Sequence, residues 1–125
     1  MVLSRFLEPP DLLVVTLTGV VTTSDQKELV TFARDVSVKA GSVRALLRLD
    51  QFAGWRPDAL VDRNAAWLRD DEPVTKIAIV GEPAWRAPVL TLMAQPIRRM
   101  PVEYFGTEAR ARRWLAQAPS HTLSF

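Results

Sequence analysis

Apolar residues fall into four short runs along the chain, separated by longer amphipathic segments. Each run is rich in Val, Ile, Leu or aromatic residues and is bounded by Gly, Pro or Asp, which is typical of strands. The four runs are residues 12–18, 44–49, 75–80 and 101–105. A further segment, residues 2–7, leads into the sequence Glu-Pro-Pro-Asp and predicts a short antiparallel edge strand that turns into the first run.

The segments between the runs carry helical patterns. The first helix has Thr23 and Ser24 as candidate N-caps, with Gln26 three residues after Thr23 as in a capping box, and is predicted to end at Gly41. Its apolar stripe consists of Leu29, Phe32, Ala33, Val36 and Ala40. The second helix begins near residues 57–58, where a proline suits the first helical position, and stops before the acidic residues 70–72.

Two more helices flank the last strand. The third is predicted to start at Pro83, and prolines within it and after it limit its regularity and length. Its apolar residues are Trp85, Val89, Leu92 and Met93. The fourth opens at Thr107, a suitable N-cap, and places Ala111, Trp114 and Leu115 at helical spacing.

The predicted order of elements is β-β-α-β-α-β-α-β-α. Such alternation is typical of an α/β fold with a mixed, mostly parallel sheet, here of about five strands with about four helices. The 125 residues suffice for one hydrophobic core of ordinary size, so we expect a single domain over residues 1–119. Residues 120–125 are predicted to form a flexible tail.

Composition and charge argue against several classes of protein. Sixteen basic and fourteen acidic residues give a formal net charge of +2, a balance too even to indicate nucleic-acid binding. Cysteine is absent, which removes disulfides, thiolate nucleophiles and Cys-based zinc sites. No apolar run approaches the roughly 18 residues of a membrane-spanning helix, and the first apolar segment is too short for a signal peptide. We therefore expect a cytoplasmic protein.

Residues that carry catalytic chemistry are sparse. The single histidine, His121, falls in the predicted tail, so no Ser-His-acid triad and no multi-histidine metal site can be assembled. The sequence Gly-Glu-Pro at residues 81–83 precedes a helix but lacks the further glycines and the lysine of a phosphate loop. We expect no catalytic residue, metal ion, cofactor or phosphorylation site. An enzyme of unrecognised type is a minor alternative.

Five arginines near the C-terminus form a candidate basic face: Arg98, Arg99, Arg110, Arg112 and Arg113. Such a face would suit anionic lipid, nucleic acid or an acidic protein. Arg110 and Arg113 are one helical turn apart but Arg112 points elsewhere, so a solvated helix surface is the favoured interpretation. Neither a recognition helix nor a stacking platform supports nucleic acid.

Several strings, in this order and spacing, resemble the SpoIIAA-like family of small STAS-like proteins. They are LLRLD followed by FAGW within residues 46–55, KIAIVGEPAW at residues 76–85, and VEYF at residues 102–105, with Glu108-Ala109 and Trp114-Leu115 after it. The resemblance covers most of the chain. It implies a STAS-like fold, which is also compared with the lipid-binding CRAL-TRIO fold, and a role in holding an apolar ligand or touching a membrane.

One departure from the STAS pattern bears on regulation. The STAS proteins that antagonise anti-sigma factors use a phosphorylatable Ser at the start of the helix after the third strand. Residues 43–74 of this chain contain no Ser or Thr. The phosphoserine switch is therefore not expected here.

Three predicted loops should meet at the carboxyl ends of the parallel strands, where ligands of α/β proteins bind. The loops are residues 50–55, 81–85 and 105–107. Candidate ligand-binding residues there are Asp50, as a polar anchor, and Phe52, Trp55, Trp85, Val89 and Met93, as an apolar lining. The alternative is that the apolar residues are ordinary core and that Asp50 caps a turn.

Two functions of different class compete. In the first, the chain is a non-catalytic binding module for an apolar small molecule or lipid, and its third helix moves over a cavity or onto a membrane surface. In the second, it is a protein-interaction or regulatory module that pairs with itself or with another protein, with Trp67 or Trp114 as an anchor. The sequence identifies neither the ligand nor the partner.

Overall fold

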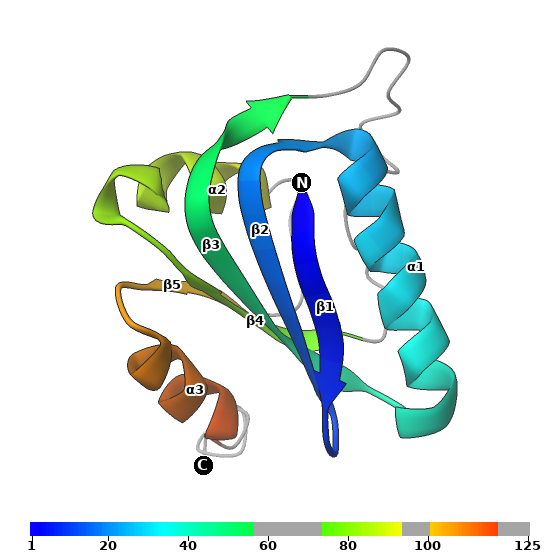
Figure 1. Ribbon diagram of the computed structural model, residues 1–125. Coiled ribbons are helices and arrows are strands. Elements are labelled where there is room, and N and C mark those ends of the chain that lie inside the picture. Colours follow the sequence, from blue (N-terminus) through cyan, green and yellow to red (C-terminus); the bar gives the residue numbers. More distant parts are fainter. Residues whose placement is uncertain (57–73, 94–100, 118–125) are drawn as a thin grey trace.

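A computed structural model describes residues 1–56, 74–93 and 101–117 (Figure 1). These residues form five strands, three α-helices and one short 3₁₀ helix. The elements in chain order are β1 (Val2–Glu8), β2 (Leu12–Thr22), α1 (Thr23–Ala40), β3 (Val43–Arg56), β4 (Val74–Val80), η2 (Pro83–Trp85), α2 (Arg86–Met93), β5 (Val102–Phe105) and α3 (Glu108–Ala116). Three of the four predicted helices are present; the one predicted from residues 57–58 lies outside the described residues, as does the predicted tail.

The strands form one mixed sheet in the order β1-β2-β3-β4-β5. β1 is an edge strand that pairs antiparallel with β2, as predicted, and the other three neighbouring pairs are parallel. Helices α1 and α2 pack on one face of the sheet, which we call the α1 face, and α3 packs on the other, the α3 face (Figure 1). The chain therefore has the predicted α/β architecture, with a sheet between two helical layers.

Strands β2 and β3 continue past the ends predicted at residues 18 and 49, so the loop predicted at residues 50–55 is wrong. The added residues pair in parallel, with Gly19 opposite Phe52 and Val21 opposite Trp55. Irregularities in the register make this possible, because Gln51 and Gly54 take positive φ angles of 53° and 128°. Residues that resemble strand ends in the sequence are bulge positions in the fold.

The N-cap of α1 is Thr22, one residue before the first of the two predicted caps. The Asp25 N–H donates to the Thr22 hydroxyl oxygen at 3.3 Å, and the Thr22 N–H donates to the Asp25 carboxylate at 2.9 Å. Asp25 therefore completes the capping box and Gln26 does not, contrary to the prediction. The helix ends at Gly41 as predicted, where φ is 79°.

The last two helices begin where the sequence predicts. Pro83 opens the 3₁₀ turn η2, which continues directly into α2. Pro88 lies in the first turn of α2, where its missing N–H removes no intrahelical hydrogen bond, so it does not break the helix. Thr107 caps α3 by accepting a hydrogen bond from the Arg110 N–H at 3.3 Å.

Buried apolar residues form two clusters, one on each face of the sheet. Neighbouring residues of β2 divide between them because successive side chains of a strand point to opposite faces. The larger cluster, on the α1 face, includes Leu13, Val15, Leu17, Leu47, Ile77, Ile79 and Tyr104. The smaller one, on the α3 face, consists of Leu12, Val14, Leu46, Ala78, Ala111 and Leu115. The predicted apolar stripe of α1 packs against the larger cluster.

Candidate functional site

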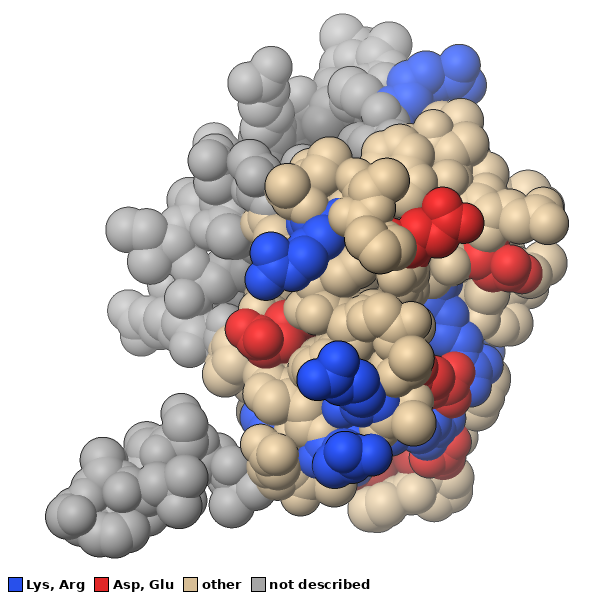
Figure 2. Space-filling model, turned by 90° about the vertical axis from the view of Figure 1, so that its left-hand side faces the viewer, with Lys and Arg blue, Asp and Glu red and all other residues tan. Residues whose placement is uncertain are grey.

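The described part of the candidate basic face is a solvated surface of mixed charge. Arg110 and Arg113 are exposed on α3, whereas Arg112 is half-buried and paired with carboxylates. Figure 2 shows basic and acidic residues interspersed on this side of the molecule. Arg98 and Arg99 lie outside the described residues. No continuous basic stripe runs along the described part of α3.

Three of the six predicted site residues pack against the α1-face cluster. The rings of Phe52 and Trp85 pack edge to face, with centroids 4.8 Å apart, and Val89 packs against the same α1-face cluster. Gly54 lies beside this pair: a Cβ there would make an ordinary contact of 3.6 Å with the Trp85 indole, and it is the φ of 128° that favours glycine. Phe52 and Trp85 therefore close on each other as part of the core.

The other three predicted residues do not join this group in the described structure. Asp50 is exposed and, two residues after Arg48, falls on the α3 face by strand alternation. The irregularity at Gln51 turns Phe52 to the α1 face. Trp55 is the next-to-last residue of β3 and Met93 is the last residue of α2, but their side chains lie outside what the structure describes.

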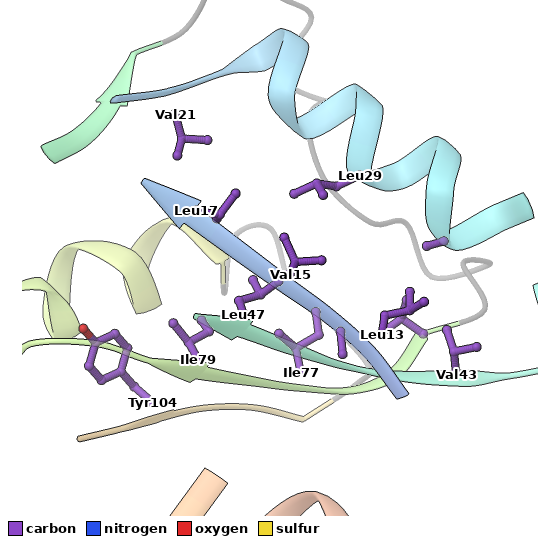
Figure 3. Packing of buried hydrophobic residues seen from close by; sticks show 13 residues of the cluster. Leu13, Val15, Leu17, Val21, Leu29, Val43, Leu47, Ile77, Ile79 and Tyr104 are labelled. Atoms are coloured by element: carbon purple, nitrogen blue, oxygen red, sulfur yellow. The ribbon is translucent and has the colours of Figure 1, made fainter. Parts of the chain in front are cut away.

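A narrow cleft lies between α1 and the sheet, in the core whose packing is shown in Figure 3. Its volume is about 40 Å³. Every residue that lines it is apolar: Leu13, Val15, Leu29, Val30, Phe32, Ala33, Ala45, Leu47, Val74 and Ile77. A space of this size admits roughly two water-sized groups, and walls without polar partners favour apolar groups over water. The cleft therefore suits a short stretch of hydrocarbon.

Gln26 is a buried polar residue one helical turn from this cleft. Its side chain is 1% exposed, and neither Nε2 nor Oε1 has a hydrogen-bond partner among the residues that the structure describes. Leu29, Val30 and Ala33 follow it by three, four and seven positions, so all four share one face of α1. Because buried amides are nearly always hydrogen-bonded, this side chain is the least satisfied polar group of the described core.

A wider, open groove of about 470 Å³ lies between β1 and α1. Arg5 of β1 reaches across it: the guanidinium pairs with Glu28 at 2.7 Å and lies 5.4 Å from the Phe32 ring centroid. The remaining lining residues, Ser24, Lys27, Thr31 and Asp35, add one charge of each sign. The groove therefore carries no net charge that would select an ionic ligand.

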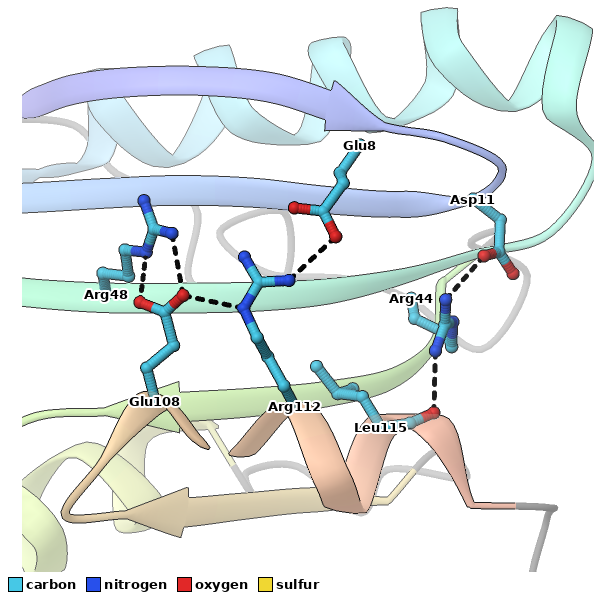
Figure 4. A network of polar contacts seen from close by, with 7 residues as sticks. All are labelled: Glu8, Asp11, Arg44, Arg48, Glu108, Arg112 and Leu115. Atoms are coloured by element: carbon cyan, nitrogen blue, oxygen red, sulfur yellow. Dashed lines mark hydrogen bonds and ion pairs between the residues drawn. The ribbon is translucent and has the colours of Figure 1, made fainter. Parts of the chain in front are cut away.

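A polar network fastens α3 to the sheet (Figure 4). Arg48 of β3 donates two hydrogen bonds to Glu108, at 2.7 and 2.9 Å. Arg112 donates to Glu108 at 2.7 Å and to Glu8 of β1 at 2.8 Å. The hydrogen bonds from Arg48 and Arg112 hold the pKa of Glu108 below its usual value of 4.5. The network links β1, β3 and α3, which is a structural role.

We expect the Glu108→Gln variant to lose about 0.5–1 kcal/mol of unfolding free energy at neutral pH, a small amount because solvent screens these half-exposed groups. Since the pKa of Glu108 is lowered in the folded chain, its ionised form stabilises above about pH 4.5 and this contribution disappears as the pH falls through the folded-state pKa. Urea unfolding at neutral pH and at about pH 3 measures the difference. The exposed Glu103→Gln variant is the control. A deficit equal at both pH values would contradict this explanation.

Metal ligands do not gather in the described ranges. Within residues 1–56, 74–93 and 101–117, no group of three or more His, Cys, Asp or Glu side chains could hold a metal ion. Over the same ranges, no helix is long and apolar enough to cross a membrane. The polar side chains that do converge, Glu8, Arg48, Glu108 and Arg112, pair with one another.

The family model for SpoIIAA-like proteins matches residues 12–116, from the start of β2 to the end of α3. The chain belongs to the SpoIIAA-like family. It is similar to a solved structure from Shewanella loihica PV-4, an uncharacterized protein of the DUF3478 family with a SpoIIAA-like fold. The TM-score is 0.62 at 16% sequence identity, and the match covers 93% of each chain. No functionally curated protein matches the chain.

These comparisons agree with the resemblance seen in the sequence and extend to the fold alone. The SpoIIAA-like architecture fixes where the strand ends, α1 and α2 lie. It does not name a ligand, since the structural neighbour is itself uncharacterized.

None of the ten residues that line the cleft is among the site residues predicted from the sequence of this SpoIIAA-like chain. One of the ten, Val30, lies one helical turn after the buried Gln26. The spacing to Leu29 and Ala33 places both on the apolar face of the helix. Because Gln26 was assigned to the capping box from the sequence, Gln26 was not recognised as a core-facing residue.

Proposed function

We propose that the chain is a non-catalytic binding module that holds an apolar, lipid-like ligand between α1 and the sheet. The observation that carries this proposal is the wholly apolar lining of the cleft. Each methylene group that leaves water for such surroundings contributes about 0.8 kcal/mol. A short hydrocarbon chain therefore gains useful affinity there without any polar contact.

A longer chain requires α1 to move away from the sheet, and the helix is attached in a way that favours this. Among its described side chains only Gln26, Leu29 and Ala33 are buried, and one of these is polar, whereas Phe32, Val36 and Ala40 contact the core as half-buried residues. Val38 is 84% exposed. Elements with few buried apolar contacts open at low free-energy cost. In this proposal α1 is therefore the helix that moves. The sequence instead predicted movement of the third helix, which corresponds to α2 in the structure.

Titration with pentane, followed by the NMR shifts of the Leu, Val and Ala methyl groups, tests this function. We expect Ala33→Leu, which adds bulk inside the cleft, to weaken pentane binding by at least about tenfold. Leu29→Ala enlarges the cleft and should strengthen binding by about tenfold, while costing about 2–5 kcal/mol of unfolding free energy. The two variants thus change affinity in opposite directions.

The control is Val38→Leu, which adds the same kind of bulk on the exposed side of α1. It should bind pentane as the original chain does. If the methyl groups of Leu29, Val30 and Ala33 show no shift at saturating pentane, the cleft is not a ligand site.

A second function, protein interaction through β1, is favoured by one observation. β1 is an edge strand, and it exposes Leu3 by 55% and Phe6 by 42%. Exposed apolar residues on an unpaired edge suit pairing with another strand. The earlier candidate anchor Trp114 instead packs against Phe105 and Lys76, and Trp67 lies outside the described residues. Sedimentation velocity over a range of concentrations distinguishes the functions, since a strictly monomeric chain would exclude self-pairing.

A further inference from the structure

The side chain of Gln26 presents both a hydrogen-bond donor and an acceptor to the interior. Its Nε2 and Oε1 atoms are buried, and no described residue pairs with either. Capping does not occupy it, because Thr22 and Asp25 satisfy each other. A group that complements this amide must both accept and donate a hydrogen bond.

The position of Gln26 relates this amide to the cleft. Leu29 and Val30, which line the cleft, are its neighbours on the next turn of α1, and Cβ atoms at such spacing lie about 5–6 Å apart. Figure 3 shows Leu29 and Val21 in the part of the core near the start of α1. Gln26 is not among the residues that line the closed cleft, so a chain reaches its amide when α1 moves away from the sheet.

The charges around the start of α1 favour an uncharged group at this position. The carboxylate of Asp25 lies 3.2 Å from the amino group of Met1 and accepts the Thr22 N–H, so these charges offset each other. A carboxylate in the core would need a cationic partner to offset the loss of its hydration. It would also place a second acceptor against Oε1 of Gln26.

We propose that Gln26 binds the head group of a single-chain amphiphile whose head is uncharged and both donates and accepts a hydrogen bond, as in a fatty amide or a fatty alcohol. This inference rests on the proposed function, because the hydrocarbon chain lies in the apolar cleft. Hydrogen bonding to Gln26 then makes some head groups bind more tightly than others. A site with a hydrogen-bonding partner for the ligand discriminates strongly against analogues that leave this partner unpaired.

The test compares four probes with the same chain length: pentane, pentanol, pentanamide and pentanoate at neutral pH. Affinities come from NMR titration of the methyl groups that line the cleft. We expect pentanamide and pentanol to bind at least about tenfold more tightly than pentane, and pentanoate to bind more weakly than pentanamide. Because pentane makes no polar contact, its affinity tests only the proposed function, which is binding in the apolar cleft.

Gln26→Met keeps the approximate size of the side chain and removes both hydrogen-bonding atoms. It should abolish the preference for pentanamide over pentane while pentane affinity stays within about twofold. The control is Gln117→Met, an exposed position on the C-terminal side of α3, which should keep the full preference. If pentane binds but the head-group preference is absent or unchanged in Gln26→Met, this inference is overturned and the apolar site stands. If no probe binds, the proposed function fails as well.

Discussion

The Leu46→Ala variant is expected to lower the free energy of unfolding by about 3 kcal/mol, within the range of about 2–5 kcal/mol for such truncations. Leu46 lies in β3, is 0% exposed, and belongs to the α3-face cluster. The variant loses the transfer free energy of the deleted carbons and leaves a cavity. The sheet cannot close this cavity, because β3 is held by hydrogen bonds to β2 and β4 on both sides. Urea unfolding monitored by circular dichroism measures the loss.

The matched control is Leu3→Ala on the edge strand, where the side chain is 55% exposed. This substitution should change stability by no more than about 0.5 kcal/mol. Equal losses in the two variants would contradict the description of the α3-face core. Since Leu46 and the cleft lie on opposite faces of the sheet, pentane binding at the cleft, followed by the methyl groups of Leu29, Val30 and Ala33, should be unchanged in folded Leu46→Ala.

The second large effect is expected at Gly81, where the chain leaves β4. A Cβ at this position would lie 2.5 Å from the Tyr104 hydroxyl oxygen and 3.0 Å from Leu49 Cδ1. Tyr104 cannot move freely, because its buried hydroxyl, whose pKa is raised by burial, donates to the Glu82 carbonyl oxygen at 2.6 Å. Gly81→Ala should therefore cost about 1–3 kcal/mol of unfolding free energy, measured in urea.

Two further variants separate close packing from a general effect of removing glycine. Gly106→Ala is the control, since a Cβ there would meet nothing within 4 Å. Adding Tyr104→Phe to Gly81→Ala removes the nearest atom, so the double variant should lose less than the sum of the two single variants. Full additivity would show that the alanine at position 81 acts through some other contact.

The elements predicted well from the sequence are those in which the local pattern and the tertiary environment agree. β4 and β5 are short apolar runs between clear breakers, and Thr107 caps α3 as its residue type predicts. The stripe of α1 that includes Leu29 and Ala33 faces the core because its spacing follows the helical period.

The extensions of β2 and β3 could not be predicted, because they depend on pairing between distant segments. Gly19 and Gly54 have the same local appearance as strand ends. Only the parallel register, in which Gly19 lies opposite Phe52, shows that the strands continue through them. The same register turns Phe52 to the α1 face and leaves Asp50 exposed, so the predicted polar anchor is separated from its apolar partners.

The candidate site was predicted at the carboxyl ends of the strands, whereas the cleft lies alongside α1. Phe52 and Trp85 were predicted as site residues because they are aromatic, but in the structure they pack on each other. The cleft arises where Ala33 and Ala45, two small side chains far apart in the sequence, both line the space between helix and sheet. Such a gap is a property of facing surfaces, and no local pattern encodes it.

The most direct test of ligand binding between α1 and the sheet is a search for intermolecular nuclear Overhauser effects between pentane and the methyl-labelled chain. Binding in the cleft requires cross-peaks from pentane to the methyl groups of Val15, Ala33 and Leu47, which line it from both sides. Cross-peaks confined to exposed residues such as Leu3, or none at saturating pentane, would contradict it.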